Sequence, residues 1–522
     1  MPNFMTTPPL RVVKWIIIVV VALVLLLLLA GSLLSRYARK TLQSRIEAFG
    51  GTIGDLNVNL FTRSISISGL EVSLLPDSSD RVLAKCRVED IQLSNIDIYQ
   101  ILINKELDIE EIVFGNGEIK FDRKANLTDS IETREENALK GVFVERLSFR
   151  DFKFLVVSDS AHEFSGTLNG TMGNLQSSDT ADLTEIEGYT LENIDAQVTD
   201  FLASVSDFYE IDIKRINANS EKNKLDVDSL TLVPKFPKYK FSQVAGKQID
   251  RVNTFINKIE VSGLLYNHLR DSSLVATNIR ILSGEVYSFR DKRMTFKETK
   301  NKPLPMAALK EIGFGIEVDT IQIKNSIITY EEFAPDGFEG GKITFEDLNA
   351  TLTNLGNRSY YNKPDHASLI ASARLMGHGL IEASFRLPYD QDKPYHAEGR
   401  IGKLALHHLN PPLENLAFVN IESGILNEIN FNFDYNDRSS NGKVTINYEN
   451  LKINGLKKEK STVINELKTL LINTVVKNDK DKSVPTEKRT GTIDFERDRK
   501  RQIFNFWWKS LFSGIKSSVL EN

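Results

Sequence analysis

Residues 107–121 read LDIEEIVFGNGEIKF, and residues 316–330 read IEVDTIQIKNSIITY. The two segments match position for position: apolar and polar residues alternate, a two-residue spacer interrupts the alternation, and a turn-forming residue follows before the alternation resumes. Residues 142–156 repeat the pattern, and weaker copies occur at 86–98 and 274–287. An alternation with a period of two is typical of β-strands that bury one face.

The spacer and the turn-forming residue predict how these strands bend. A two-residue spacer inverts a strict alternation, so both halves of a segment face the same side only if the strand contains a β-bulge. Repeated bulges indicate a curved sheet. The Asn116-Gly117 and Asn325-Ser326 steps are typical of tight hairpins. We therefore expect each segment to turn back antiparallel onto its successor.

The sequence thus predicts a mainly β body over residues 53–455, built as an elongated, curved antiparallel sheet. Convincing helical patterns are almost absent there, the main candidate being residues 306–312. A sheet with one apolar face must close into a barrel, pack on a second sheet, or curl into a trough whose lining meets something other than water. Regular repetition without clear linkers favours the trough, a taco-like β-groove. Successive sandwiches with closed cores are the alternative.

The apolar positions of the repeated segments are the candidate lining of such a groove. A lining of this kind holds an acyl chain without any specific polar residue, because burial of each methylene contributes about 0.8 kcal/mol. The candidates are Ile65, Ile67, Val88, Ile112, Phe114, Ile119, Ile321, Ile323 and Ile328.

A membrane segment precedes the β body. Residues 15–34, WIIIVVVALVLLLLLAGSLL, contain no charge, and as a helix they would span about 30 Å, the thickness of the hydrocarbon core. A cleavable signal peptide has a shorter apolar region and seldom resumes with a basic cluster, so we predict a retained transmembrane helix within residues 1–35. Basic residues flank this run on both sides and do not fix its orientation: Arg11, Lys14, Arg36, Arg39 and Lys40.

Two further segments depart from the β pattern. Residues 36–52 read as a short amphipathic connecting helix that stops at Gly50-Gly51. Residues 456–522 contain apolar residues at helical spacing (461–476), a charged linker, and a basic run followed by an aromatic helix face. That face suits a membrane–water interface, and packing over the open end of the β body is the alternative. The interface candidates are Phe504, Trp507, Trp508 and Phe512.

Composition argues against several classes of function. Lys and Arg total 65 and Asp and Glu total 70, without a basic stripe between residues 50 and 450, so nucleic acid is not an expected partner. The single cysteine, Cys86, excludes intramolecular disulfides, and the alternation around it indicates a buried strand position.

No catalytic constellation is recognisable. Residues 337–342, GFEGGK, lack the first glycine and the hydroxyl residue of a phosphate-binding loop, and no G-x-S-x-G motif occurs. We therefore expect no enzyme, no cofactor and no metal site. Five of the seven histidines fall in one region, but none forms an i, i+4 pair around a glutamate, as zinc proteases require: His366, His378, His396, His407 and His408.

Several segments resemble the AsmA-like family of Gram-negative envelope proteins, relatives of bridge-like lipid-transfer proteins with a repeating β-groove. The resemblance begins at the N-terminal apolar helix followed by TIGDLNVNLFTRSISISGLEVSLL (52–75). It continues in SLTLVPKFPKYKFSQ (229–243), QIDRVN (248–253) and YSFRDKR (287–293). The segment at about 400–455, from LALHHLNPP to NYENLKI, is similar to the family's C-terminal signature. Its matching residues are Asn410, Pro411, Ser423, Gly424, Gly442, Tyr448 and Leu451.

This resemblance implies an inner-membrane protein with a single transmembrane helix and the bulk of its chain in the periplasm. Its groove would take phospholipid acyl chains, in phospholipid transport or in outer-membrane assembly and homeostasis, possibly with other envelope proteins as partners. The chain is much shorter than the family's bridging members, which puts autonomous crossing of the periplasm in doubt. The alternative is a non-enzymatic structural or interaction scaffold of the envelope with a closed β core.

Overall fold

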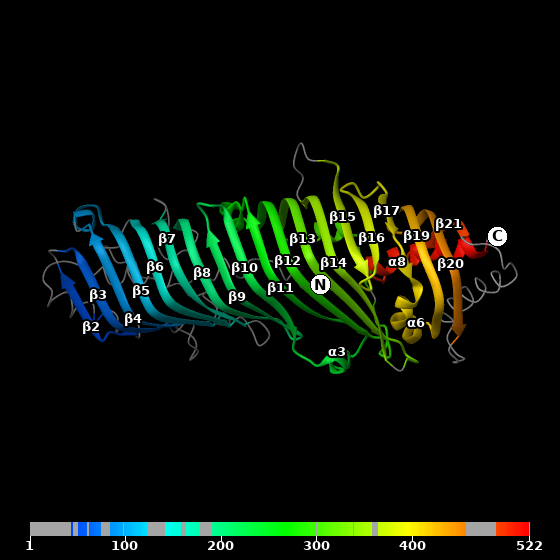
Figure 1. Cartoon of the computed structure of the whole chain (residues 1–522). Coiled ribbons are helices and arrows are strands. Elements are labelled where there is room, and N and C mark those ends of the chain that lie inside the picture. Colours follow the sequence, from blue (N-terminus) through cyan, green and yellow to red (C-terminus); the bar gives the residue numbers. More distant parts are fainter. Residues whose placement is uncertain are drawn as a thin grey trace. The chain divides into compact units, whose positions relative to one another are not determined.

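The computed structural model describes residues 43–44, 51–59, 62–74, 84–97, 99–122, 141–157, 163–177, 189–298, 300–337, 339–357, 364–455 and 487–520. These residues form 21 strands connected by loops and short helices (Figure 1). Most strand pairs are antiparallel and the strands curve, so the predicted mainly β, curved sheet is confirmed.

Several predicted segments lie outside the described residues. They include the transmembrane helix at 15–34 and the helical pattern at 461–476. Of the predicted connecting helix at 36–52, the structure describes Gln43 and Ser44, which are helical, and Gly51–Thr52, which form the first strand, β1. Within the described ranges, no helix is both long and apolar enough to cross a membrane.

The described residues divide into two compact units. The N-terminal unit comprises the residues up to Leu230 together with Ser262–Ser272, and the C-terminal unit comprises Thr231–Val261 and the residues from Ser273 onward.

In the N-terminal unit, β1 and β2 both pair with β3, and from β3 to β10 each strand pairs with the next along the chain. A π-helix, η1 (Gln100–Asn104), precedes β5, and the short helix α4 spans Tyr266–Arg270. The strands are β1 (Gly51–Thr52), β2 (Asp55–Asn59), β3 (Ser64–Leu74), β4 (Ala84–Ile96), β5 (Glu106–Asp122), β6 (Gly141–Val157), β7 (Glu163–Ser177), β8 (Tyr189–Ser206), β9 (Tyr209–Asn219) and β10 (Lys224–Pro234).

In the C-terminal unit, each strand from β12 to β16 pairs with the next one along the chain. Strands β17 and β18 both pair with β19, β19 pairs with β20, and β20 pairs with β21. The strands are β11 (Asp250–Ser262), β12 (Ser273–Asp291), β13 (Gly315–Phe333), β14 (Gly340–Gly356), β15 (His366–Leu375), β16 (Gly379–Pro388), β17 (Tyr395–Ile401), β18 (Leu404–Ala405), β19 (Val419–Tyr435), β20 (Ser439–Gly455) and β21 (Glu487–Glu496). The helices are α3 (Lys238–Ala245), α5 (Pro305–Lys310), η3 (Leu406–Leu409), α6 (Asn410–Leu416) and α8 (Ile503–Leu520).

The predicted hairpins at the turn-forming steps are wrong, because these steps lie inside continuous strands. Asn116 has φ 46° within β5, and Asn325 has φ 50° within β13. Asparagine tolerates this left-handed conformation better than most residues. The two strands pair in parallel with β6 and β12, respectively. Neighbouring copies of the sequence pattern therefore lie side by side in register, with Ile112 opposite Leu147.

The repeated segments contain bulges, but not where the sequence predicts them. The register continues without a shift across the spacers at 110–111 and 319–320, and two bulges fall at the turn-forming residue instead. The register shifts between Phe149 and Phe152 in the β6–β7 pair, and between Ile323 and Ser326 in the β13–β14 pair. A bulge at this point resets the alternation and bends the strand. The apolar residues on either side of it therefore stay on one face.

The C-terminal segment differs from its prediction in one respect. Residues 487–496 form β21, an antiparallel neighbour of β20. Arg489, Gly491 and Ile493 occupy its buried positions, so the alternation contains too few aliphatic residues to be recognised. Gly491 is required there because a Cβ atom would lie 2.0 Å from the carbonyl oxygen of Gly514 in α8. The predicted helix at 306–312 is confirmed as α5.

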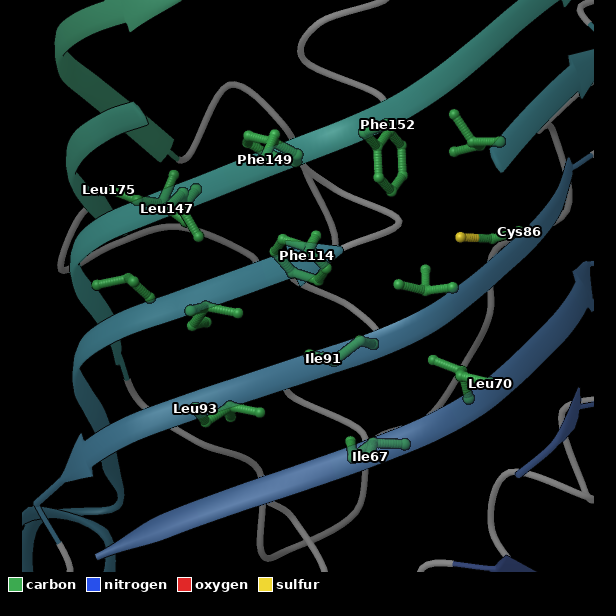
Figure 2. Packing of buried hydrophobic residues seen from close by; sticks show 14 of the residues in the cluster. Ile67, Leu70, Cys86, Ile91, Leu93, Phe114, Leu147, Phe149, Phe152 and Leu175 are labelled. Atoms are coloured by element: carbon green, nitrogen blue, oxygen red, sulfur yellow. The ribbon is translucent and has the colours of Figure 1, made fainter. Parts of the chain in front are cut away.

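The apolar face of the N-terminal unit forms a tightly packed core (Figure 2). Phe114, Phe149 and Phe152 pack at its centre, with ring centroids 5.4 Å apart for Phe114–Phe149 and 5.6 Å apart for Phe149–Phe152. Gly117, which follows the turn-forming Asn116, makes room for the Phe152 ring. A Cβ atom at Gly117 would lie 2.2 Å from that ring.

Gly117→Ala should therefore destabilise the N-terminal unit by about 1–3 kcal/mol through overpacking. Gly115→Ala is the matched control, because its Cβ would have 3.6 Å of clearance from Asp90. Guanidinium titration followed by circular dichroism compares the two. Equal transition midpoints for both variants would contradict the proposed role of Gly117.

The buried thiol of Cys86 offers a probe of the same core. Burial raises its pKa to about 12, so almost no thiolate, the reactive form, exists near neutral pH. We expect a maleimide to label Cys86 at pH 8 only in denaturant, with a rate that follows unfolding. Rapid labelling of the native chain would show that this core is open.

Candidate functional site

Three cross-strand rows of apolar residues cover one face of the C-terminal unit. The parallel β12–β13 pair and the antiparallel β13–β14 pair align the repeated segments across three strands. The rows are Ile279–Ile321–Leu352, Ile281–Ile323–Ala350 and Val286–Ile328–Phe345. We call them the apolar rows.

The apolar rows on β12 and β13 are partly accessible. Their members are half-buried, and they belong to none of the hydrophobic core clusters that the described residues form. The corresponding positions of the N-terminal unit differ sharply. Ile112, which matches Ile321 in the sequence pattern, is only 1% exposed, and Ile119, which matches Ile328, is 2% exposed. The same pattern thus forms a closed core in one unit and a partly open face in the other.

Farther along the C-terminal unit, the same face is covered. The first apolar row continues across Leu369 to Phe385, and Trp507 of α8 stacks on the Phe385 ring with centroids 4.5 Å apart. Leu304 and Met306, in the crossover between β12 and β13, are buried in the same cluster as Phe506 of α8. The row residues of β14 already pack against this cluster or are buried, so the part of the face that stays accessible lies on β12 and β13.

Polar residues border the apolar rows where β12 and β13 end. Arg290, Tyr330 and Glu332 stand at even spacing from the row residues of their strands and hence on the same face. Lys292 directly follows β12, and Asp250 is the first residue of β11. Arg290 donates from Nε to Asp250 at 2.6 Å, and Lys292 lies 2.6 Å from Glu332. Tyr330 donates to Glu332 at 2.9 Å. Burial, followed by the Glu332 charge, raises the pKa of Tyr330 above its usual range, so its hydroxyl remains a donor. We call these five residues the polar rim.

The nine predicted lining residues divide between the two units. Ile67, Val88, Ile112, Phe114 and Ile119 are buried in the N-terminal core, and Ile65 packs against it half-buried. The three residues of the C-terminal unit are half-buried members of the apolar rows: Ile321, Ile323 and Ile328.

The sequence patterns assigned no role to the β12 members of the rows or to the polar rim, although Asp250, Arg290 and Lys292 lie within segments that carry the family resemblance. The weaker pattern copy at 274–287 contained the signal for Ile279, Ile281 and Val286. Arg290 and Glu332 belong to different segments, and only the parallel β12–β13 register places them at adjacent positions.

The four predicted interface residues all lie on α8. Trp507 packs inward, against Phe385 and Tyr435. Phe504 and Trp508 point away from the sheet, being 72% and 52% exposed, and Phe512 is half-buried beside Trp508.

The five histidines of residues 366–408 fall in three separate places of the described structure. His378 stacks on His408 with ring centroids 3.6 Å apart, and His407 lies beside His408. His366 and His396 each contact an aspartate instead. Across the part of the chain that the structure describes, no group of three or more His, Cys, Asp or Glu side chains has an arrangement that could hold a metal ion.

Comparison with known proteins identifies no relative. No model of a known protein family matches the chain, and no curated protein matches it. The resemblance to the AsmA-like family therefore stays a prediction from the sequence.

Ile112→Asp and Ile321→Asp form a matched pair, because the two isoleucines occupy the same position of the pattern. An unpaired charge at Ile112 would be fully desolvated, so we expect it to destabilise the N-terminal unit by about 4 kcal/mol or more. Ile321 retains access to solvent, so the cost there should stay near about 1–2 kcal/mol. Guanidinium titration measures both, and equal losses would show that the two faces are equally closed.

Proposed function

We propose that this protein binds lipid acyl chains on the apolar rows of its C-terminal unit. The observation that carries the proposal is the partial exposure of Ile279, Ile281, Ile321, Ile323 and Ile328 on one continuous face. Soluble proteins rarely leave a large contiguous apolar surface uncovered unless something binds there.

The chemistry of this face fits a hydrocarbon ligand. Aliphatic side chains bind apolar chains without directional contacts, and each buried methylene contributes about 0.8 kcal/mol. A chain of a dozen methylenes would thus gain several kcal/mol even if only partly covered. No nucleophile or metal ligand is needed for this activity.

The polar rim suggests how a bound lipid would be oriented. Acyl chains would follow the apolar rows, and the headgroup would lie at the end where Arg290, Lys292 and Glu332 meet. This arrangement suits an amphipathic ligand. Its acyl chains would contact aliphatic side chains, and its charged headgroup would lie beside charged side chains.

The cellular role that we propose is phospholipid transport, or assembly and homeostasis of the outer membrane. It rests on the resemblance to the AsmA-like family and on residues 15–34, which would anchor the chain in the inner membrane with its bulk in the periplasm. Phospholipids would be its ligands, and other envelope proteins are its candidate partners.

A structural scaffold of the envelope is the second candidate. The closed core of the N-terminal unit favours it, because Leu107, Leu147 and Phe152 are fully buried and leave no room for a ligand. One chain can serve both functions if its N-terminal unit acts as the structural scaffold and its C-terminal unit binds lipid.

Lipid extraction tests the proposal. A fragment of residues 36–522, purified without detergent, should carry phospholipid that mass spectrometry detects, and Ile321→Asp should remove most of it. Ile327→Asp is the matched control, because Ile327 is 38% exposed and its odd spacing from Ile328 places it on the opposite face of β13. Lipid-free wild-type protein, or equal loss in both variants, would favour the scaffold.

A further inference from the structure

Helix α8 uses one face entirely for packing. Phe506, Ser510 and Ser518 are at most 2% exposed, and Ser440 of β20 donates to Ser510 at 2.7 Å. Gly514 lies so close to Val444 that a Cβ atom there would be 2.6 Å from its side chain. This face of α8 is therefore fixed on β20 and β21.

The opposite face of α8 is also apolar, although nothing among the described residues covers most of it. Phe504, Trp508 and Phe512 follow one another at i, i+4 and i+8, which aligns them along the helix. Phe504 and Trp508 are the two most exposed large aromatic side chains of the helix. Trp508 and Phe512 stack with centroids 6.0 Å apart, and the Phe504 and Trp507 rings pack edge to face with centroids 5.4 Å apart. We call Phe504, Trp508 and Phe512 the aromatic stripe.

The charges that α8 itself carries have a single sign. Residues 499–520 contain five Lys or Arg residues and no Asp or Glu. At 100° per residue, Lys509 and Lys516 fall beside the stripe on the outward half of the helix. Aromatic rings flanked by lysines suit the interface of an anionic bilayer, where the rings enter the acyl boundary and the ammonium groups reach the headgroups.

We infer that the outward face of α8 is a docking surface for an anionic lipid bilayer, on which the helix lies without leaving the sheet. This contact goes beyond the proposed acyl-chain site and does not depend on it. The absence of acidic residues along the stripe favours a bilayer over a protein surface, which would present both charges.

Quenching of Trp508 fluorescence tests the inference on the full chain. The chain is held in lipid discs and mixed with vesicles, both made of phosphatidylethanolamine and phosphatidylglycerol with brominated acyl chains, so contact with either bilayer is detected. Trp15→Phe removes the tryptophan of the apolar N-terminal segment, and an additional Trp508→Phe variant defines the part of the signal that belongs to Trp508.

We expect strong quenching of Trp508, reduced to less than half by Phe504→Ser with Phe512→Ser. Asn505→Ser, a change at an exposed position of the same helix, should leave the quenching of Trp508 unchanged. A Ser440→Cys, Ser510→Cys disulfide fixes α8 on β20 and should preserve the quenching. Three results would overturn the inference: no quenching in the unlocked chain, equal quenching without the two phenylalanines, or loss of quenching in the locked chain, which would mean that the inner face binds.

Discussion

A sheet with one apolar face requires something to cover that face, and the structure meets this requirement unevenly. In the N-terminal unit, apolar side chains from β3 to β8 pack into one core that leaves Phe114 and Leu147 almost inaccessible. In the C-terminal unit, the cluster that contains Met306 and Phe506 of α8 covers the face from β14 onward. The partly exposed rows on β12 and β13 are the remainder, and the proposed function follows from them.

The in-strand bulge is the local device that makes these long faces continuous. A left-handed residue such as Asn116 or Asn325 resets the alternation, so that apolar residues before and after it share one side of a strand of up to 19 residues. A small residue next to the bulge then allows the adjacent strand to approach closely. Gly117 accommodates the Phe152 ring, and Gly284 donates its backbone N–H to Ser326 at 3.0 Å.

Much of the fold could be predicted from the sequence, because alternation and spacing are local signals. They predict the strands, the occurrence of bulges but not their positions, and α5. They do not predict the parallel pairing of β5 with β6, because an Asn-Gly step serves equally well in a hairpin and in an in-strand bulge. The sequence pattern also does not predict how exposed each apolar side chain is. Ile112 and Ile321 occupy identical pattern positions, but the tertiary packing makes Ile112 a core residue and leaves Ile321 half-accessible.

We propose that acyl chains reach the apolar face of the C-terminal unit and not that of the N-terminal unit. Site-specific photo-crosslinking in cells tests it most directly, with benzoylphenylalanine placed at Ile323 or at Phe114, which match in the repeated pattern. Mass spectrometry then identifies the adducts. We expect a phospholipid adduct at position 323 and none at position 114. Adducts of equal yield at both positions, or at neither, would contradict it.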